Sequence, residues 1–231
     1  MSVQFYTFSY QNPTREANMK RRFADENLPL EFVNSVEFSD QRLTAAPPEV
    51  RRNWAIMFNH LDMLTKFLNS SNDYGIFCED DIFIRHNFKQ FLPEIVAGAK
   101  RRSLEILLLG YLLPYKPVEI VSRAREFAEI GPNFTFHTYP DDLWGSQMYM
   151  LSRAGATKLL EKYSVDYAKA TLANPNLCPF SPDWTLTKDG RRAAIYPMLA
   201  VEEGIVVTTH EGQIDFHKRC FQAQFDPEQF H

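Results

Sequence analysis

Three consecutive acids, Glu79-Asp80-Asp81, are the residues in this sequence whose types and spacing are best suited to chemistry. If they continue a strand, Glu79 and Asp81 point to one side and Asp80 points to the other. Three adjacent negative charges repel one another unless a cation lies among them, and all-oxygen ligand sets favour Mg²⁺ or Mn²⁺ over Zn²⁺. The triplet therefore predicts a divalent-metal site with Glu79 and Asp81 as ligands. The alternatives are a solvated acidic turn or a cap on the helix that follows.

The segments around the triplet indicate where it lies in the fold. Residues 74–78 form a short apolar run without polar alternation, which is typical of a strand covered on both faces in a mainly parallel sheet. A second continuous apolar run, residues 104–109, predicts a neighbouring strand. Open α/β sheets bind ligands at the carboxyl ends of their strands. The acids are therefore expected on the floor of a cleft at that edge of the sheet.

Strand and helix patterns alternate along the rest of the chain. Apolar periodicity and N-cap chemistry predict helices over residues 12–24, 48–68, 88–100 and 152–163, and further strands over residues 3–8, 30–36 and 195–199. This order predicts a single α/β domain over residues 1–203, with a mostly parallel, Rossmann-like central sheet flanked by helices. Residues 204–231 are expected to form a C-terminal tail.

The composition excludes several functional classes. With 25 Lys and Arg against 29 Asp and Glu, the net charge of -4 argues against nucleic acid or an anionic membrane as partner. Three dispersed cysteines without a CxxC pair argue against a disulfide framework and favour the reducing cytoplasm. No apolar stretch approaches the roughly 18 residues of a transmembrane helix. The phosphate-binding GxxxxGK and dinucleotide-binding GxGxxG motifs are missing as well.

Five blocks of the sequence, in the same order, resemble glycosyltransferase family 25, whose members include lipopolysaccharide and collagen galactosyltransferases. They are Asn59-His60-Leu61, then Ile76-Phe77-Cys78-Glu79-Asp80-Asp81-Ile82, then Leu107-Leu108-Leu109-Gly110, then Trp144-Gly145-Ser146-Gln147-Met148-Tyr149-Met150-Leu151-Ser152-Arg153-Ala154-Gly155-Ala156, and finally Pro182-Asp183-Trp184 with Tyr196-Pro197. The fourth block is the most specific of these matches. Together the blocks span about residues 3–200.

The resemblance implies a GT-A fold and an inverting transfer of a sugar from a nucleotide-diphosphate-sugar, such as a UDP- or GDP-sugar, to a glycan or glycoprotein acceptor. It places Glu79 and Asp81 on the outer acids of the family's metal-binding DxD motif, with Mn²⁺ or Mg²⁺ as the cofactor. By the same resemblance, His210 in the C-terminal segment is a candidate to complete the metal site. The tail would then contribute to the donor site.

Inverting transfer needs a carboxylate base for the acceptor hydroxyl. Asp183, in the matched Asp-Trp pair, is the first candidate, and Asp141 and Asp142 are reserves on a loop. The alternative for Asp183 is an N-cap or turn acid after Pro182. His60 is interpreted as a buried, hydrogen-bonded histidine rather than a ligand.

Five further residues are candidates for holding the donor. Arg15 and Arg52 suit a diphosphate, Phe8 and Tyr10 suit a flat nucleobase, and Asp80 belongs to the triplet itself. The alternatives are solvated helix charges for the arginines and a core position for Phe8. The family's two glycines before the first block are replaced here by Arg52 and Ala55, so the sequence leaves the base and sugar of the donor open.

Two other functions remain open at this point. The same acids would serve a metal-dependent phosphohydrolase or nucleotidyltransferase. A non-catalytic nucleotide-sugar-binding module would keep the fold and the ligand without turnover.

Overall fold

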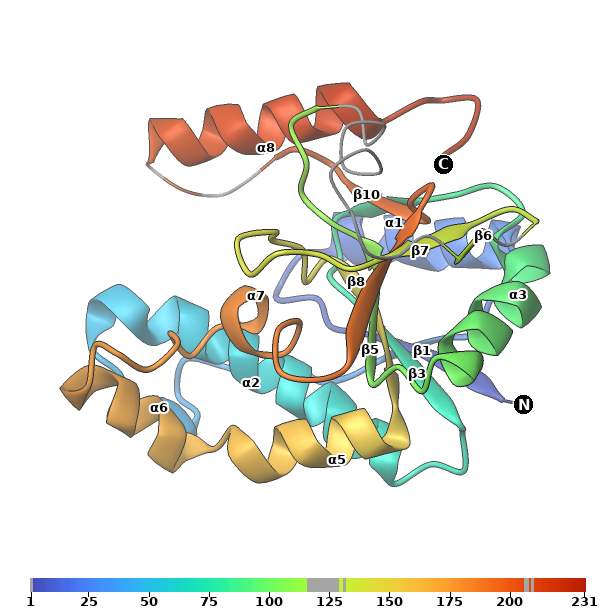
Figure 1. Ribbon diagram of the computed structural model, residues 1–231. Coiled ribbons are helices and arrows are strands. Elements are labelled where there is room, and N and C mark those ends of the chain that lie inside the picture. The colour runs from blue at the N-terminus through green and yellow to red at the C-terminus, as the bar shows by residue number, and fades with distance from the viewer. Residues whose placement is uncertain (1, 116–128, 131, 206–207, 209) are drawn as a thin grey trace.

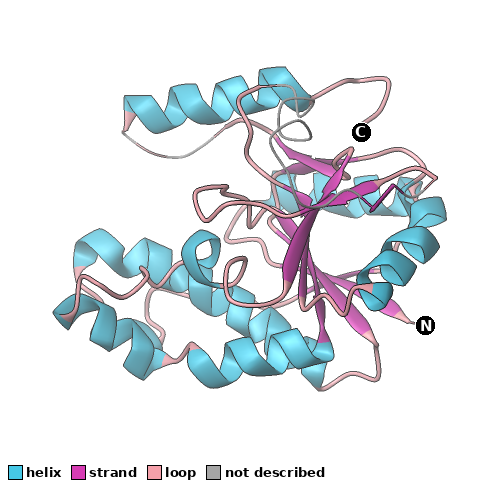
Figure 2. Ribbon diagram, viewed as in Figure 1, coloured by secondary structure: helices cyan, strands magenta, loops and turns pink. Residues whose placement is uncertain are grey.

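The computed structural model describes residues 2–115, 129–130, 132–205, 208 and 210–231. In this part of the chain, the centre is an eight-stranded sheet with helices on both faces (Figures 1 and 2). The strands follow the order β2-β1-β3-β8-β5-β9-β7-β6, with bounds β1 Val3–Thr7, β2 Leu30–Phe32, β3 Tyr74–Cys78, β5 Ile106–Gly110, β6 Glu129–Ile130, β7 Thr135–His137, β8 Met148–Ser152 and β9 Arg192–Tyr196. Of these eight described strands, β7 and β8 run opposite to the other six. The predicted α/β fold class, with a mostly parallel Rossmann-like sheet, is confirmed.

The middle of the sheet is built from continuous apolar runs. Strands β3 and β5 are buried along almost their whole length, as their sequences predict. Strand β8 lies between them and pairs antiparallel with both, with Tyr149 opposite Phe77 and Leu108. The mixed apolar and small residues of 144–151 did not predict this strand. Its insertion brings the segment just before it, around Ser146, beside the end of β3.

Two apolar clusters cover the two faces of the sheet. Helices α2, α5 and α6 contribute to one cluster and helices α1 and α3 to the other; the bounds are α1 Pro13–Asp25, α2 Pro48–Leu68, α3 Phe88–Arg101, α5 Arg153–Lys162 and α6 Val165–Ala173. The predicted helices 12–24, 48–68, 88–100 and 152–163 agree with α1, α2, α3 and α5 to within about a residue at each end. Local capping explains this agreement: Asn12 accepts a hydrogen bond from the Arg15 amide, and Ser152 accepts one from the Gly155 amide.

A small second sheet follows the acid triplet. Strand β4 (Ile82–Ile84) follows the acid triplet directly and pairs antiparallel with β10 (Ala200–Glu202). The segment 204–231, expected as a tail, contains helix α8 (Glu211–Gln224). The Phe83 ring lies 5.9 Å from that of Phe221 and 4.6 Å from that of Phe225, so α8 packs on the outer side of β4. The partner of α8 is therefore a strand about 130 positions earlier, which local periodicity does not reveal.

Candidate functional site

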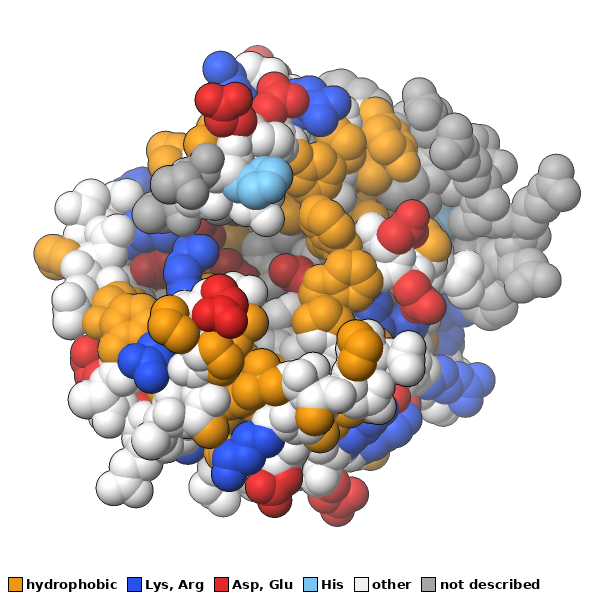
Figure 3. Space-filling view, turned by 90° about the vertical axis from the view of Figure 1, so that its left-hand side faces the viewer, with side chains coloured by type: hydrophobic (Ala, Val, Ile, Leu, Met, Phe, Trp, Pro, Cys, Tyr) orange, Lys and Arg blue, Asp and Glu red, His pale blue; other side chains and the backbone are white. Residues whose placement is uncertain are grey.

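The acid triplet lies in a bend between β3 and β4, at the carboxyl end of β3. The side alternation expected of a continuous strand therefore does not apply, yet Glu79 and Asp81 still face the same space. Both line a small pocket of about 110 Å³, and all three acids line an adjoining pocket of about 440 Å³. Figure 3 shows the hollow on this face, with acidic side chains inside it and basic side chains at its edge. The expected cleft at this edge of the sheet is present.

The guanidinium of Arg15 forms ion pairs with two acids of the triplet. Its Nη1 lies 3.2 Å from Oδ1 of Asp80 and 3.1 Å from Oδ2 of Asp81. The other carboxylate oxygen of Asp80 accepts a hydrogen bond from the Ser9 hydroxyl. Arg15 occupies the first turn of α1, which the Asn12 cap holds at this end of the sheet. One guanidinium therefore partly neutralises two of the three acids.

Asp81 is the acid of the triplet whose ionised form is least stabilised by its surroundings. The residue is only 8% exposed, and its Oδ1 is buried with no hydrogen-bond partner among the described residues. Burial, together with the negative charges of Glu79 and Glu202, raises the pKa of Asp81 well above its usual value, while Arg15 opposes that rise. A buried oxygen acceptor without a donor is the observation expected where a cation belongs. Hard oxygen ligands of this kind fit Mg²⁺ or Mn²⁺.

Glu79 is held by contacts from the sheet and from α2. The Ser146 hydroxyl donates to its Oε1 at 2.8 Å, and Nε2 of the buried His60 lies 3.8 Å from the same oxygen. Nδ1 of His60 lies 2.9 Å from the Tyr149 hydroxyl, and this contact fixes the imidazole beside Glu79. Burial raises the pKa of Glu79, but the contacts with His60 and Ser146 outweigh burial and lower it overall. Glu79 therefore stays ionised and available to a cation.

Asp183 is the predicted base that the structure brings next to the triplet. It lies in the short helix α7 (Pro182–Thr185) and lines the small pocket with Glu79. Its Oδ1 accepts hydrogen bonds from the amides of Gly145 at 3.0 Å and Ser146 at 2.9 Å. Burial and the charge of Glu79 raise its pKa, against these two hydrogen bonds. The carboxylate is thus fixed in position and disposed to accept a proton.

The two reserve acids lie elsewhere. The Asp141 side chain is 83% exposed and pairs with Arg192, and Asp142 is exposed too. Neither belongs to the residues that line the two pockets. The sequence analysis ranked Asp183 before them through its family resemblance, and the structure brings only Asp183 of the three into a pocket with the triplet.

The larger pocket contains the whole predicted donor-binding set. Phe8, Tyr10, Arg15, Arg52 and Asp80 all line it, together with Asn12, Val36, Phe38, Ala55, Ile56, Asn59, Glu79 and Asp81. One part of this pocket is apolar and aromatic, and the other part is charged. The rings of Tyr10 and Phe38 meet edge to face at 5.8 Å and are 36% and 50% exposed, whereas Phe8 is nearly buried.

The C-terminal segment contributes His217 to the small pocket. His210, the predicted ligand, is exposed just before α8, outside the residues that line either pocket. Nδ1 of His217 lies 2.7 Å from Oε2 of the buried Glu202 on β10. Burial lowers the pKa of His217, but the bond to Glu202 more than compensates and raises it. The sequence offered no spacing that distinguishes His217 from His210, and it did not indicate Glu202 or Ser146.

Fold and site together define an α/β protein with a two-part pocket, aromatic at one end and rich in carboxylates at the other. No protein-family model and no curated protein sequence matches the chain. A mannose-1-phosphate geranyltransferase from Thermus thermophilus is similar in structure, with 11% identity, a TM-score of 0.43, and coverage of 84% of this chain and 74% of that one.

A glycosyltransferase involved in the glycosylation of the major capsid of PBCV-1 has 9% identity and a TM-score of 0.40, covering 94% and 99% of the two chains. HddC from Yersinia pseudotuberculosis has 15% identity and a TM-score of 0.36, covering 96% and 79%. Similarity at this level assigns neither a family nor an activity. None of the helices in the described part of the chain is both long and apolar enough to cross a membrane.

Proposed function

We propose that this protein is a metal-dependent, inverting glycosyltransferase of the family 25 type, which moves a sugar from a nucleotide-diphosphate-sugar to a glycan or glycoprotein acceptor. The observation that carries the proposal is the continuity of the two pockets. Arg15, Arg52, Glu79 and Asp81 line both of them, so the aromatic pocket opens through charged residues onto the one that contains Asp183. An activated sugar with a flat base, two phosphates and a reacting carbon has the same order of parts.

The larger pocket is assigned to the nucleotide. Tyr10 and Phe38 present aromatic rings to the base, and Arg15 and Arg52 present guanidinium groups to the diphosphate. Because Arg15 already pairs with Asp80 and Asp81, donor binding would exchange part of that contact for phosphate oxygens. The choice of UDP or GDP rests on the resemblance alone, and the pocket is compatible with either.

Glu79 and Asp81 are the proposed protein ligands of Mn²⁺ or Mg²⁺. His217 is proposed in place of His210 as a third ligand, because the contact of its Nδ1 with Glu202 leaves Nε2 available. When bound, the cation would neutralise the negative charge that develops on the departing diphosphate.

Asp183 is the proposed base. As the acceptor oxygen forms its bond to the anomeric carbon, the bond from that carbon to the diphosphate oxygen breaks, and the hydroxyl proton passes to Asp183. The proton then leaves to solvent, and the nucleotide diphosphate departs. The raised pKa of Asp183 favours proton acceptance, and the amides of Gly145 and Ser146 hold the carboxylate in one orientation.

The acceptor side is assigned to exposed aromatic residues beside Asp183. Trp144 precedes Gly145, Trp184 follows Asp183, and their indoles lie 6.1 Å apart with 36% and 39% exposure. Such rings bind the apolar face of a sugar. A reducing, cytoplasmic setting is part of the proposal and is supported by the free thiols of Cys78, Cys178 and Cys220.

The test is a panel of UDP- and GDP-sugars incubated with Mn²⁺ and simple sugar acceptors, with release of UDP or GDP and extension of the acceptor as readouts. A transferase releases the nucleotide and extends an acceptor, and it loses both when Asp183 is replaced by Asn. Cleavage of simple phosphate esters would instead indicate the phosphohydrolase or nucleotidyltransferase. Nucleotide-sugar binding without any product would indicate the non-catalytic module.

A further inference from the structure

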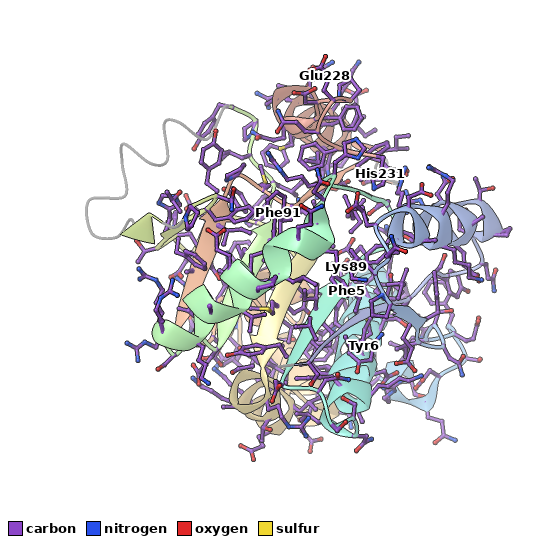
Figure 4. All side chains as sticks on the ribbon, turned by 90° about the vertical axis from the view of Figure 1, so that its right-hand side faces the viewer. Phe5, Tyr6, Lys89, Phe91, Glu228 and His231 are labelled. Atoms are coloured by element: carbon purple, nitrogen blue, oxygen red, sulfur yellow. The ribbon has the colours of Figure 1, made fainter. Side chains whose placement is uncertain are left out.

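A second group of metal-ligating side chains lies outside the two pockets. Glu26 at the end of α1, His86 just before α3 and His231 each offer one ligand atom, and these atoms all lie within 4.8 Å of one another. Oε1 of Glu26 is 3.4 Å from Nε2 of His231 and 3.9 Å from Nδ1 of His86. Figure 4 shows the labelled His231 at the meeting point of α1 and α3. The three residues are separated by 60 and 145 positions in sequence, so only tertiary structure brings them together.

Ordinary packing accounts poorly for this arrangement. Nε2 of His231 is buried and makes no hydrogen bond within the described residues, although the Glu26 carboxylate is close by. The imidazole rings of His86 and His231 lie only 4.5 Å apart, at an angle of 57°. If both were protonated they would repel each other, and burial together with the charge of His86 lowers the pKa of His231. Neutral imidazole is the form that binds metals.

We propose that Glu26, His86 and His231 bind a divalent transition-metal ion, with Zn²⁺ as the preferred ion. Two imidazoles and one carboxylate are a donor set that suits zinc, and they leave a fourth position for water. With metal–ligand bonds of about 2.0–2.1 Å, the ligand atoms of a tetrahedral site lie about 3.4 Å apart. The Glu26–His231 pair already has this separation, and Nδ1 of His86 lies 3.9 Å from the same Glu26 oxygen.

The surroundings support the proposed site. The side chains of Glu26 and His231 are 10% and 18% exposed and that of His86 is 37% exposed, so an ion has a path from solvent through His86. Oδ2 of Asp25 lies 4.0 Å from Nδ1 of His231, where it can orient the imidazole as an outer-shell carboxylate does in zinc sites.

The position of the site gives it a structural role. The backbone of His231 pairs with that of Ile84 in both directions, at 3.0 and 3.1 Å, so the segment that carries it is attached to β4. Strand β4 begins immediately after the acid triplet, and α1 carries Arg15. An ion bound here would join the end of α1, the start of α3 and the C-terminal segment behind the donor pocket. This inference does not depend on the proposed function, since none of the three residues lines either pocket.

The experiment is a calorimetric titration of the metal-stripped full chain with Zn²⁺, performed in an Asp81→Asn background so that the acidic pocket does not compete. We expect one equivalent of Zn²⁺ to bind and the melting temperature to rise. Glu26→Gln and His86→Asn should each weaken binding at least about tenfold. His210→Asn, which removes an exposed histidine elsewhere, is the matched control and should bind as its parent does.

A second measurement covers the case in which a variant fails to fold. Co²⁺ bound to the same Asp81→Asn chain should give the intense visible absorption of a four-coordinate site with nitrogen ligands, and Zn²⁺ should displace it. A weak six-coordinate spectrum, no binding, or Zn²⁺ affinity unchanged in Glu26→Gln and His86→Asn would overturn the proposal.

Discussion

Replacing Asp81 with Asn tests the metal role of the acid triplet most directly. Asn has nearly the same shape, and its amide oxygen can still accept from Arg15, so the change removes mainly one negative charge. In the metal-free protein, that charge is buried beside Glu79 and Glu202, which raise the pKa of Asp81. Since a carboxylate with a raised pKa is less stable when ionised in the fold than in the unfolded chain, Asp81→Asn should stabilise the metal-free protein at pH 7.

Adding Mn²⁺ should stabilise the wild type and leave the variant unchanged. An ion present at about 100 times its dissociation constant stabilises the folded state by about 2.7 kcal/mol. In a domain of this size, each kcal/mol corresponds to about 2–4 °C, so the wild-type melting temperature should rise by about 5–11 °C. Asp81→Asn, which loses the buried ligand oxygen, should show little or no rise at the same concentration. The wild type therefore gains stability with Mn²⁺ and the variant does not.

Scanning calorimetry with and without Mn²⁺ measures both effects on one sample. Asp142→Asn is the matched control, because it removes an exposed acid outside the pockets and should keep the full Mn²⁺ response. An Asp81→Asn protein that melts with the same Mn²⁺-dependent rise as the wild type would refute the assignment of Asp81 as a ligand. A variant less stable than the wild type without metal would refute the charge argument.

Three further perturbations follow from the geometry. In Asp183→Asn, the amide oxygen can still accept hydrogen bonds from the amides of Gly145 and Ser146, but the side chain cannot take up a proton. Turnover of the nucleotide-sugar should therefore fall by about 10²–10⁴-fold, with donor affinity retained. Undiminished turnover would exclude Asp183 as the base. Gly145→Ala would place a Cβ 2.5 Å from the Tyr111 Cα, so the free energy of unfolding measured in urea should fall by about 1–3 kcal/mol. A variant as stable as the wild type would contradict this close approach. His137 is 2% exposed and burial lowers its pKa, so the unfolded chain takes up a proton more readily than the folded chain. As the pH falls below about 6.5, stability should therefore fall by up to about 1.4 kcal/mol per pH unit. A His137→Gln variant should lose this part of the pH dependence, and an unchanged slope between about pH 6.5 and 5.5 would contradict it.

The features that sequence predicted correctly are local ones. The apolar run of β3, the acids that follow it and the caps of α1 and α5 depend on neighbouring residues, and all lie where the sequence placed them. The five donor-side candidates line one pocket, and their role in binding a donor stays a prediction.

Tertiary structure alone decided which acids and histidines meet. Strand β8 enters between β3 and β5 in the opposite direction, and this insertion brings Ser146 to Glu79 and the amides of Gly145 and Ser146 to Asp183. Helix α8 packs on β4 and turns His217, rather than His210, into the small pocket. The sequence by itself therefore determined strands β1 and β3, helices α1, α2, α3 and α5 and the acids at the end of β3, since these depend on local hydrophobicity, capping and charge. The positions of Asp183 and His217 beside the triplet depended on long-range packing, which no local spacing records.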